Sequence, residues 1–131
     1  MARADSGETL SILVVEDDVA VADLLRTILN QEPGWGATIV HDASAAREVF
    51  RHIRVEVMAV DVNLPGISGL ELLELLRRDP DWGEPPVVLM SAIPDQPGIV
   101  GAVRDGVVTT CLRKPFDVDE LIHEVHAAVA S

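Results

Sequence analysis

Three carboxylates, one hydroxyl and one ammonium group stand at or just after the ends of apolar runs in this sequence. They belong to Glu16, Asp17, Asp61, Ser91 and Lys114. Three acids brought together repel one another unless a cation or a base offsets their charge. A hard divalent ion suits such oxygen ligands, and Mg2+ is favoured because it accepts one or two carboxylates together with water and a phosphoryl oxygen. These residue types therefore indicate a magnesium site.

Other metal sites fit the sequence less well. A structural calcium site is the rival interpretation, but calcium normally takes more protein oxygens than this set supplies. The spacing of the single cysteine, Cys111, and the histidines does not support zinc. The histidines lie within or beside expected helices, which favours a solvated or packed role for His41, His52, His123 and His126.

With a metal ion bound, Lys114 would complete a site for a phosphoryl group. The ion and the ammonium group would share the charge on the transferring oxygens, as phosphoryl transfer requires. An aspartate can act as the nucleophile and form an aspartyl phosphate, and the Ser91 hydroxyl could donate to a phosphoryl oxygen. Taken singly, a lysine in a salt bridge and a hydroxyl bonded to the backbone are the more ordinary interpretations. Their combination with the acids favours phosphoryl chemistry.

The elements that must position these side chains can be read from apolar periodicity. Apolar runs predict five strands, at residues 10–15, 37–40, 57–60, 87–90 and 107–112. About five helices follow these runs; Asp18 is expected to cap the first, and Asp117 with Glu120 forms a capping-box pattern for the last. The fourth helix, over residues 97–105, is expected to be short or irregular because it contains two glycines. The first helix is expected to bury Val21, Leu24, Leu25, Ile28 and Leu29, and the fourth to bury Ile99, Val100 and Val103.

The alternation of strands and helices favours an α/β fold, in which a parallel sheet carries helices on both faces. The flavodoxin-like, doubly wound order 2-1-3-4-5 is a known arrangement of five such strands, and it sets the first and third strands side by side at the switch point. In that order, Glu16, Asp17 and Asp61 would meet at one edge of the sheet. Ser91 and Lys114 would reach in from neighbouring strand ends.

Composition limits the partners. The 131 residues include 22 acids and 10 bases, for a net charge of -12. This charge disfavours a nucleic-acid or anionic-membrane surface, because phosphate backbones need clustered Lys and Arg. Residues 1–9 are interpreted as a flexible N-terminal tail, without the apolar core of a signal peptide, and residues 10–131 as one domain. No apolar run is long enough to cross a bilayer, so a cytoplasmic location is expected.

The sequence resembles the receiver domain of bacterial two-component response regulators over nearly its whole length. The matching segments are Ile12-Leu13-Val14-Val15-Glu16-Asp17-Asp18, Asp61-Val62-Asn63-Leu64-Pro65-Gly66, Ser91-Ala92 and Lys114-Pro115-Phe116. Each motif alone is weak, but together, in this order and spacing, they are specific. The resemblance implies that Asp61 is the phosphoacceptor, and that Glu16 and Asp17 hold Mg2+ with it, directly or through water. Asn63 would lend its backbone carbonyl to the ion.

The same resemblance implies further roles and partners. Ser91 takes the place of the family's switch Ser or Thr, Lys114 bridges to the phosphoryl group, and the bond from Lys114 to Pro115 is expected to be cis. The implied phosphoryl donor is a phosphohistidine on a histidine kinase or a phosphotransfer protein. The domain is expected to promote only its own phosphorylation and dephosphorylation. The output partner is left open by the sequence and would bind the face formed by the fourth helix, fifth strand and last helix. The domain itself is not expected to bind nucleic acid or a membrane, because of its negative charge.

One departure from the family pattern concerns the output. Cys111 stands three positions before Lys114, where the family usually has an aromatic residue. In the family, the aromatic ring at this position usually rotates inward when the domain is activated. A cysteine is too small to make an equivalent movement, so the sequence predicts an unconventional conformational switch. Residues 93–105 are expected to form a segment of low stability that shifts on phosphorylation.

Other functions compete with the receiver interpretation. A small Mg2+-dependent phosphatase would also use an aspartate nucleophile, but such enzymes usually carry a second aspartate two positions later, where this sequence has Asn63. A degenerate receiver would act only as a binding module, and the intact set of acids, hydroxyl and lysine argues against it. A nucleotide-binding fold is the weakest alternative, because neither glycine-rich phosphate motif is present.

Overall fold

A parallel sheet with helices on both faces organises the computed structural model, which describes residues 9–130. The sheet order is β2-β1-β3-β6-β7. The strands are β1 (Leu10–Val15), β2 (Trp35–Val40), β3 (Val57–Asp61), β6 (Val87–Ser91) and β7 (Thr110–Arg113). In sequence terms this is the order 2-1-3-4-5, so the predicted fold class is confirmed. The tail predicted over residues 1–9 lies, except for Thr9, outside the described residues.

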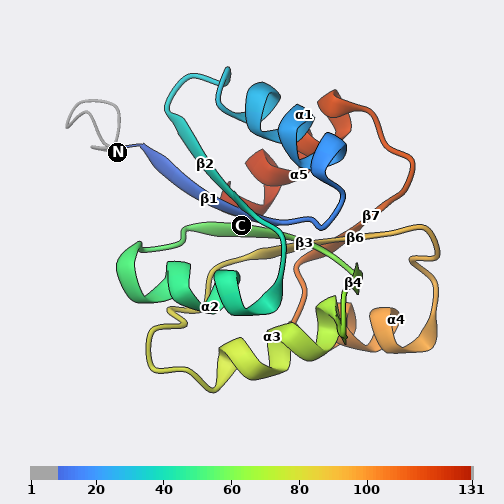
Figure 1. Ribbon diagram of the computed structural model, residues 1–131. Coiled ribbons are helices and arrows are strands. Elements are labelled where there is room, and N and C mark those ends of the chain that lie inside the picture. Colours follow the sequence, from blue (N-terminus) through green and yellow to red (C-terminus); the bar gives the residue numbers. More distant parts are fainter. Residues whose placement is uncertain (1–8, 131) are drawn as a thin grey trace.

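Five helices cover the two faces. They are α1 (Val19–Leu29), α2 (Ala43–His52), α3 (Gly69–Arg77), α4 (Pro97–Arg104) and α5 (Val118–Ala130). Figure 1 shows α1 and α5 on one face of the sheet and α2, α3 and α4 on the other. Among residues 9–130, every helix is too short or too polar to cross a bilayer.

The core is divided by the sheet into two apolar clusters. Successive side chains of a strand point to opposite faces. Leu13 of β1 therefore packs in the cluster beneath α2, α3 and α4, whereas Ile12 and Val14 pack in the cluster beneath α1 and α5. Burial on both faces explains why the strands read as continuous apolar runs.

Each cluster contains one tryptophan. Trp82, which is 8% exposed, belongs to the cluster beneath α2, α3 and α4, and its ring centroid lies 5.3 Å from that of Phe50. Trp35, which is 9% exposed, belongs to the other cluster, and its ring centroid lies 4.7 Å from that of His126. Both tryptophans precede or begin a strand, at the edge of the sheet where the strands start.

The predicted helix caps are confirmed. The Asp18 side chain accepts a hydrogen bond from the backbone N–H of Val21 at the start of α1. Before α5, the Asp117 carboxylate accepts from the Glu120 N–H at 2.9 Å, while the Glu120 carboxylate accepts from the Asp117 N–H at 3.1 Å. These side chains satisfy N–H groups that have no partner within the helix.

Two predicted helix faces are wrong in part. In α1 the buried residues are Ala22, Leu25 and Leu29, whereas Val21 and Leu24 are exposed. The α1 stripe therefore includes the small Ala22 and is narrower than the apolar pattern suggested. In α4 only Ile99 is buried, and Val100 and Val103 point to solvent. The helix is regular but short, with eight residues.

Strand boundaries also differ from prediction. β7 begins at Thr110 rather than at residue 107, because residues 105–109 form turns after α4. β2 begins earlier than expected, at Trp35. A small antiparallel hairpin, formed by β4 (Asn63–Leu64) and β5 (Ile67–Ser68), follows β3 and was not predicted.

Candidate functional site

The carboxylates meet at the edge of the sheet where the strands end. β1 and β3 are parallel neighbours, and Val15 pairs with Val60 in their register. The next residue on each strand is therefore an acid facing the same edge. Carboxylate oxygens of Glu16, Asp17 and Asp61 all lie within 4.8 Å of one another. Glu16 is 2% exposed and Asp61 is 3% exposed, whereas Asp17 is exposed.

Lys114 supplies the positive charge. Its Nζ lies 2.6 Å from Asp61 Oδ2 and 3.6 Å from Glu16 Oε1. The backbone N–H of Lys114 donates to the Ser91 carbonyl at 2.8 Å, and the bond from Lys114 to Pro115 is cis, as the resemblance implied. Burial alone would lower the pKa of Lys114, but the hydrogen bond to Asp61 and the charges of Asp61 and Glu16 outweigh burial, so the pKa is raised.

Asp61 is held at both carboxylate oxygens. While Oδ2 accepts from Lys114, Oδ1 accepts from the Asn63 backbone N–H at 2.9 Å. Gly69, the first residue of α3, lies very close to the backbone at the end of β3. A Cβ built at Gly69 would lie 2.5 Å from the Asp61 carbonyl oxygen. The Gly69 N–H also donates to the Val62 carbonyl at 2.8 Å. The position of the Asp61 backbone is thus set by the close approach of α3.

Glu16 leaves one buried oxygen without a hydrogen bond. Its Oε2 accepts from the Asp18 N–H at 3.2 Å, but among the described residues Oε1 has no hydrogen-bond partner. Burial raises the pKa of the Glu16 carboxyl and the Asp61 charge acts in the same direction, although the Asp18 N–H and the Lys114 charge lower it. A buried carboxylate oxygen that lacks a hydrogen bond and lies beside two further acids fits a divalent cation with oxygen ligands.

Ser91 lies at the end of β6, which pairs with β3, and is 2% exposed. Its Oγ accepts a hydrogen bond from the Ile93 backbone N–H at 3.1 Å. Among residues 9–130 no hydrogen bond joins this hydroxyl to Asp61 or Lys114, so Ser91 stands beside the acid cluster without contacting it by a hydrogen bond.

One histidine, which no sequence motif placed there, also lies at this edge. His41 directly follows β2, and its Nδ1 lies 3.0 Å from the Glu16 carbonyl oxygen. His52 instead pairs with Glu48 on α2, and His126 lies against Trp35. The signal that could have found His41 is its position immediately after the second strand.

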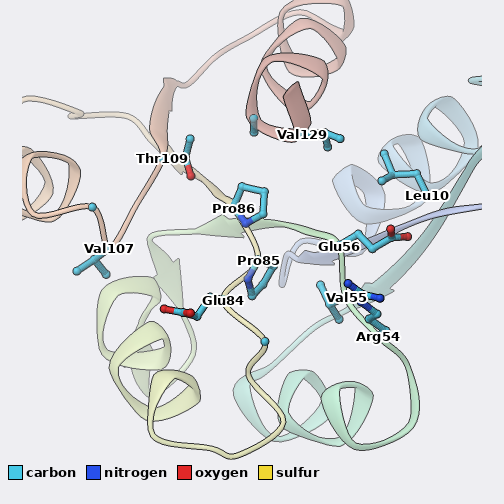
Figure 2. Close-up of a pocket in the computed structure, with 13 residues that line it drawn as sticks. Leu10, Arg54, Val55, Glu56, Glu84, Pro85, Pro86, Val107, Thr109 and Val129 are labelled. Atoms are coloured by element: carbon cyan, nitrogen blue, oxygen red, sulfur yellow. The ribbon is translucent and has the colours of Figure 1, made fainter. Parts of the chain in front are cut away.

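A cavity of about 610 Å3 opens at the opposite edge of the sheet, where the strands begin. Figure 2 shows Arg54, Glu56 and Glu84 among the side chains that line it. Its lining includes none of the six candidate site residues, which are Glu16, Asp17, Asp61, Asn63, Ser91 and Lys114. The cavity is therefore separate from the carboxylate cluster.

Known proteins resemble this chain in sequence and fold. Residues 12–126 match the family described as the response regulator receiver domain. The probable transcriptional regulatory protein TcrX of Mycobacterium tuberculosis is 35% identical over 129 residues, which are 97% of this chain and 52% of TcrX. This chain spans about half the length of the curated relatives it matches.

Two solved structures illustrate the likeness in fold. The receiver domain of the Francisella response regulator 1452 matches with a TM-score of 0.80 and 26% identity, over 93% of this chain and 98% of that one. The receiver domain of the sensor histidine kinase PA1611 from Pseudomonas aeruginosa PAO1 has a TM-score of 0.77 and 22% identity, over 94% of this chain and 99% of that one. A magnesium ion is coordinated in the active-site cleft of the PA1611 domain.

Proposed function

The chain belongs to the response regulator receiver domain family, and on that premise we propose that Asp61 accepts a phosphoryl group in the presence of Mg2+. The phosphorylated domain then signals by a change of conformation. The observation that carries this proposal is the buried Asp61 carboxylate, which is clustered with two further acids and lies 2.6 Å from Lys114 Nζ. A nucleophile, a cation site and a fixed ammonium group are thus together.

Asp61 is suited to be the nucleophile because its carboxylate is already oriented from both sides. One of its oxygens forms the bond to phosphorus while the bond from phosphorus to the donor's histidine nitrogen breaks. The electron pair of the broken bond stays on that nitrogen. The Lys114 ammonium group then faces the transferred oxygens and offsets part of their charge.

Glu16, Asp17 and Asp61 are the side chains proposed to hold Mg2+, and the backbone carbonyl of Asn63 is a further ligand. When bound, the ion supplies positive charge beside the transferring oxygens. The Oε1 of Glu16 supports this assignment, because it is a buried carboxylate oxygen without a hydrogen bond and has only the Lys114 ammonium group nearby, at 3.6 Å. The magnesium ion in the PA1611 receiver supports the choice of ion.

Ser91 is proposed as the switch hydroxyl. Its present hydrogen bond is to the Ile93 N–H, at the start of the segment that leads into α4. Turning the hydroxyl toward a phosphoryl group on Asp61 would give up that bond and free the start of the segment. This links the chemistry at β3 to the face formed by α4, β7 and α5, which is proposed to bind the output partner.

The proposed donor is a phosphohistidine on a histidine kinase or a phosphotransfer protein, and the domain acts as a switch rather than as an enzyme on other substrates. The phosphatase alternative is not favoured, because the position of its second aspartate is occupied by Asn63, whose contribution at Asp61 is a backbone N–H.

The proposal is tested by incubating the protein with phosphoramidate and Mg2+ and measuring the intact mass. One added phosphoryl group is expected in the parent protein and none in Asp61→Ala. Asp119→Ala, which removes an exposed acid on α5, is the matched control and should be modified like the parent. Undiminished labelling of Asp61→Ala would show that the phosphoacceptor is misassigned.

A further inference from the structure

His41 lies at the edge of the phosphoryl site but is not one of the proposed ligands of the cation. We infer that His41 is a positioning residue, which holds the Glu16–Asp17 peptide in the orientation that binds the divalent cation. The inference rests on the proposed function, since it concerns the same cation site. Its basis is the 3.0 Å contact between His41 Nδ1 and the Glu16 carbonyl oxygen.

The register of β1 and β2 creates this contact. The two strands are parallel, and Val15 pairs with Val40 at their ends. One residue further, the Glu16 N–H donates to the Val40 carbonyl at 3.0 Å. The Glu16 backbone is therefore bonded at its N–H by the last residue of β2 and at its carbonyl by the residue that follows.

The chemistry of the pair fixes the direction of the hydrogen bond. A carbonyl oxygen has only lone pairs, so His41 Nδ1 must carry the proton and donate. The His41 backbone is itself held between β2 and the start of α2, where the Asp42 carboxylate accepts from the Ala45 N–H at 2.8 Å. The donor thus extends from an anchored stretch of backbone, and the His41 residue itself is exposed.

The contacted carbonyl belongs to a peptide unit that both ligands share. The C=O of Glu16 and the N–H of Asp17 lie in one nearly planar group. A hydrogen bond to that carbonyl therefore restrains the direction in which the chain enters Asp17 as well as the placement of Glu16. The Glu16 carboxylate has one hydrogen bond, from the Asp18 N–H to Oε2, and a longer ion pair of 3.6 Å with Lys114. Its orientation therefore also depends on where the Glu16 backbone is held.

Calorimetric titration with Mg2+ separates this role from mere packing. His41→Leu keeps most of the bulk of the ring and removes the donor, and we expect its Mg2+ affinity to fall by about 2- to 10-fold, the value of one ordinary hydrogen bond. His41→Asn places an amide nitrogen near the position of Nδ1 and should recover most of the loss. His52→Ala, which changes an exposed histidine on α2, should bind like the parent.

A further variant distinguishes failure of the inference from failure of the proposed function. Glu16→Gln should lose most of the Mg2+ affinity; if it binds like the parent, the cation site itself is misassigned. If Glu16→Gln fails to bind while His41→Leu binds like the parent, the positioning role is overturned and the proposed function stands. If His41→Asn is as weak as His41→Leu, the loss does not follow the donor and the inference is equally overturned.

Discussion

Among single residues, Glu16 is placed so that its own ionisation is unfavourable. It is almost fully buried, one oxygen has no hydrogen bond among the described residues, and the Asp61 carboxylate lies in the same cluster. Lys114 offsets the repulsion only in part, because its hydrogen bond is to Asp61 and its Nζ is 3.6 Å from Glu16 Oε1. The pKa of Glu16 is therefore raised, chiefly by burial, in the site without metal.

This arrangement predicts that Glu16→Gln is more stable than the parent at neutral pH when metal is removed with EDTA. Burial raises the pKa of Glu16 above its ordinary value of 4.5. A raised pKa contributes stability that is fully present below the ordinary value and is lost as the pH rises through the raised one. In urea unfolding at neutral pH without metal, the Glu16→Gln variant should therefore have a higher unfolding midpoint than the parent. The midpoints of the two proteins should converge in acid.

The same measurement with Mg2+ present supplies the control. The ion should stabilise the parent, because a ligand that binds only the folded state stabilises it, and should stabilise Glu16→Gln much less. A parent that is the more stable of the two without metal at neutral pH would contradict the prediction.

Among the residues, what the sequence could not predict is the role of His41. The acids, the hydroxyl and the lysine are recognisable because they end apolar runs and belong to ordered motifs. A histidine after the second strand has no motif. Its contact with Glu16 follows only from the pairing of β1 with β2, which joins residues 25 positions apart.

Among the elements, α3 approaches β3 so closely at Gly69 that there is no room for a larger side chain. A Cβ at Gly69 would lie 2.5 Å from the Asp61 carbonyl oxygen and 3.0 Å from Val62 Cα, and both are backbone atoms. The start of α3 cannot carry a larger residue unless the helix moves away from the strand that bears the phosphoacceptor.

Gly69→Ala is therefore expected to destabilise the protein by about 1–3 kcal/mol, as overpacking usually does, and to slow phosphorylation by phosphoramidate. Gly101→Ala in α4 is the matched control: its Cβ would meet only the flexible end of Arg104 at 3.5 Å. That change should stabilise α4 by up to about 1 kcal/mol. Urea unfolding and the phosphorylation rate test the pair, and equal stability changes in the two variants would refute the packing argument.

The α4 region carries the prediction about the switch. Only Ile99 of this helix is buried, and Cys111, which stands where the family usually has an aromatic residue, is partly buried on β7. Few buried contacts give a segment low local stability. We therefore expect beryllofluoride, a mimic of the phosphoryl group, to change amide hydrogen exchange mainly in residues 93–106.

β2 provides the internal comparison for that experiment, because it lies at the other end of the sheet order from β7. Its amides should exchange at similar rates with and without beryllofluoride. Unchanged protection over residues 93–106, with changes confined to other segments, would show that the signal leaves the site by another route.

The element predictions succeeded where apolar runs are long and buried on both sides. They failed at the ends of elements, where contacts between segments distant in sequence bear on the boundary. Thr109 was assigned to a strand, but it belongs to the turn region before β7, and its Oγ1 accepts from the Val87 N–H at 3.1 Å. In α1 and α4, apolar residues at helical spacing lie beside the buried stripe and face solvent, which periodicity alone does not distinguish.

Over the whole molecule, the strand order could not be worked out from periodicity, because the pairings that set it join distant segments. The order came from resemblance to a known fold, and the structure confirms it. Once the order is given, the meeting of Glu16, Asp17 and Asp61 follows directly, since parallel strands that end together place their next residues at one edge. The cavity at the opposite edge was not predicted, because loops from several connections form it.

The division of the core into two clusters has a spectroscopic consequence. The sequence has two tryptophans and no tyrosine, and one tryptophan lies on each side of the sheet. Trp35→Phe would leave Trp82 to report on the layer of α2, α3 and α4, and Trp82→Phe would leave Trp35 to report on the layer of α1 and α5. Both indoles lie away from the strand ends that carry the acids. A change in either emission spectrum on phosphorylation would therefore record a rearrangement transmitted along the sheet, separately for each face.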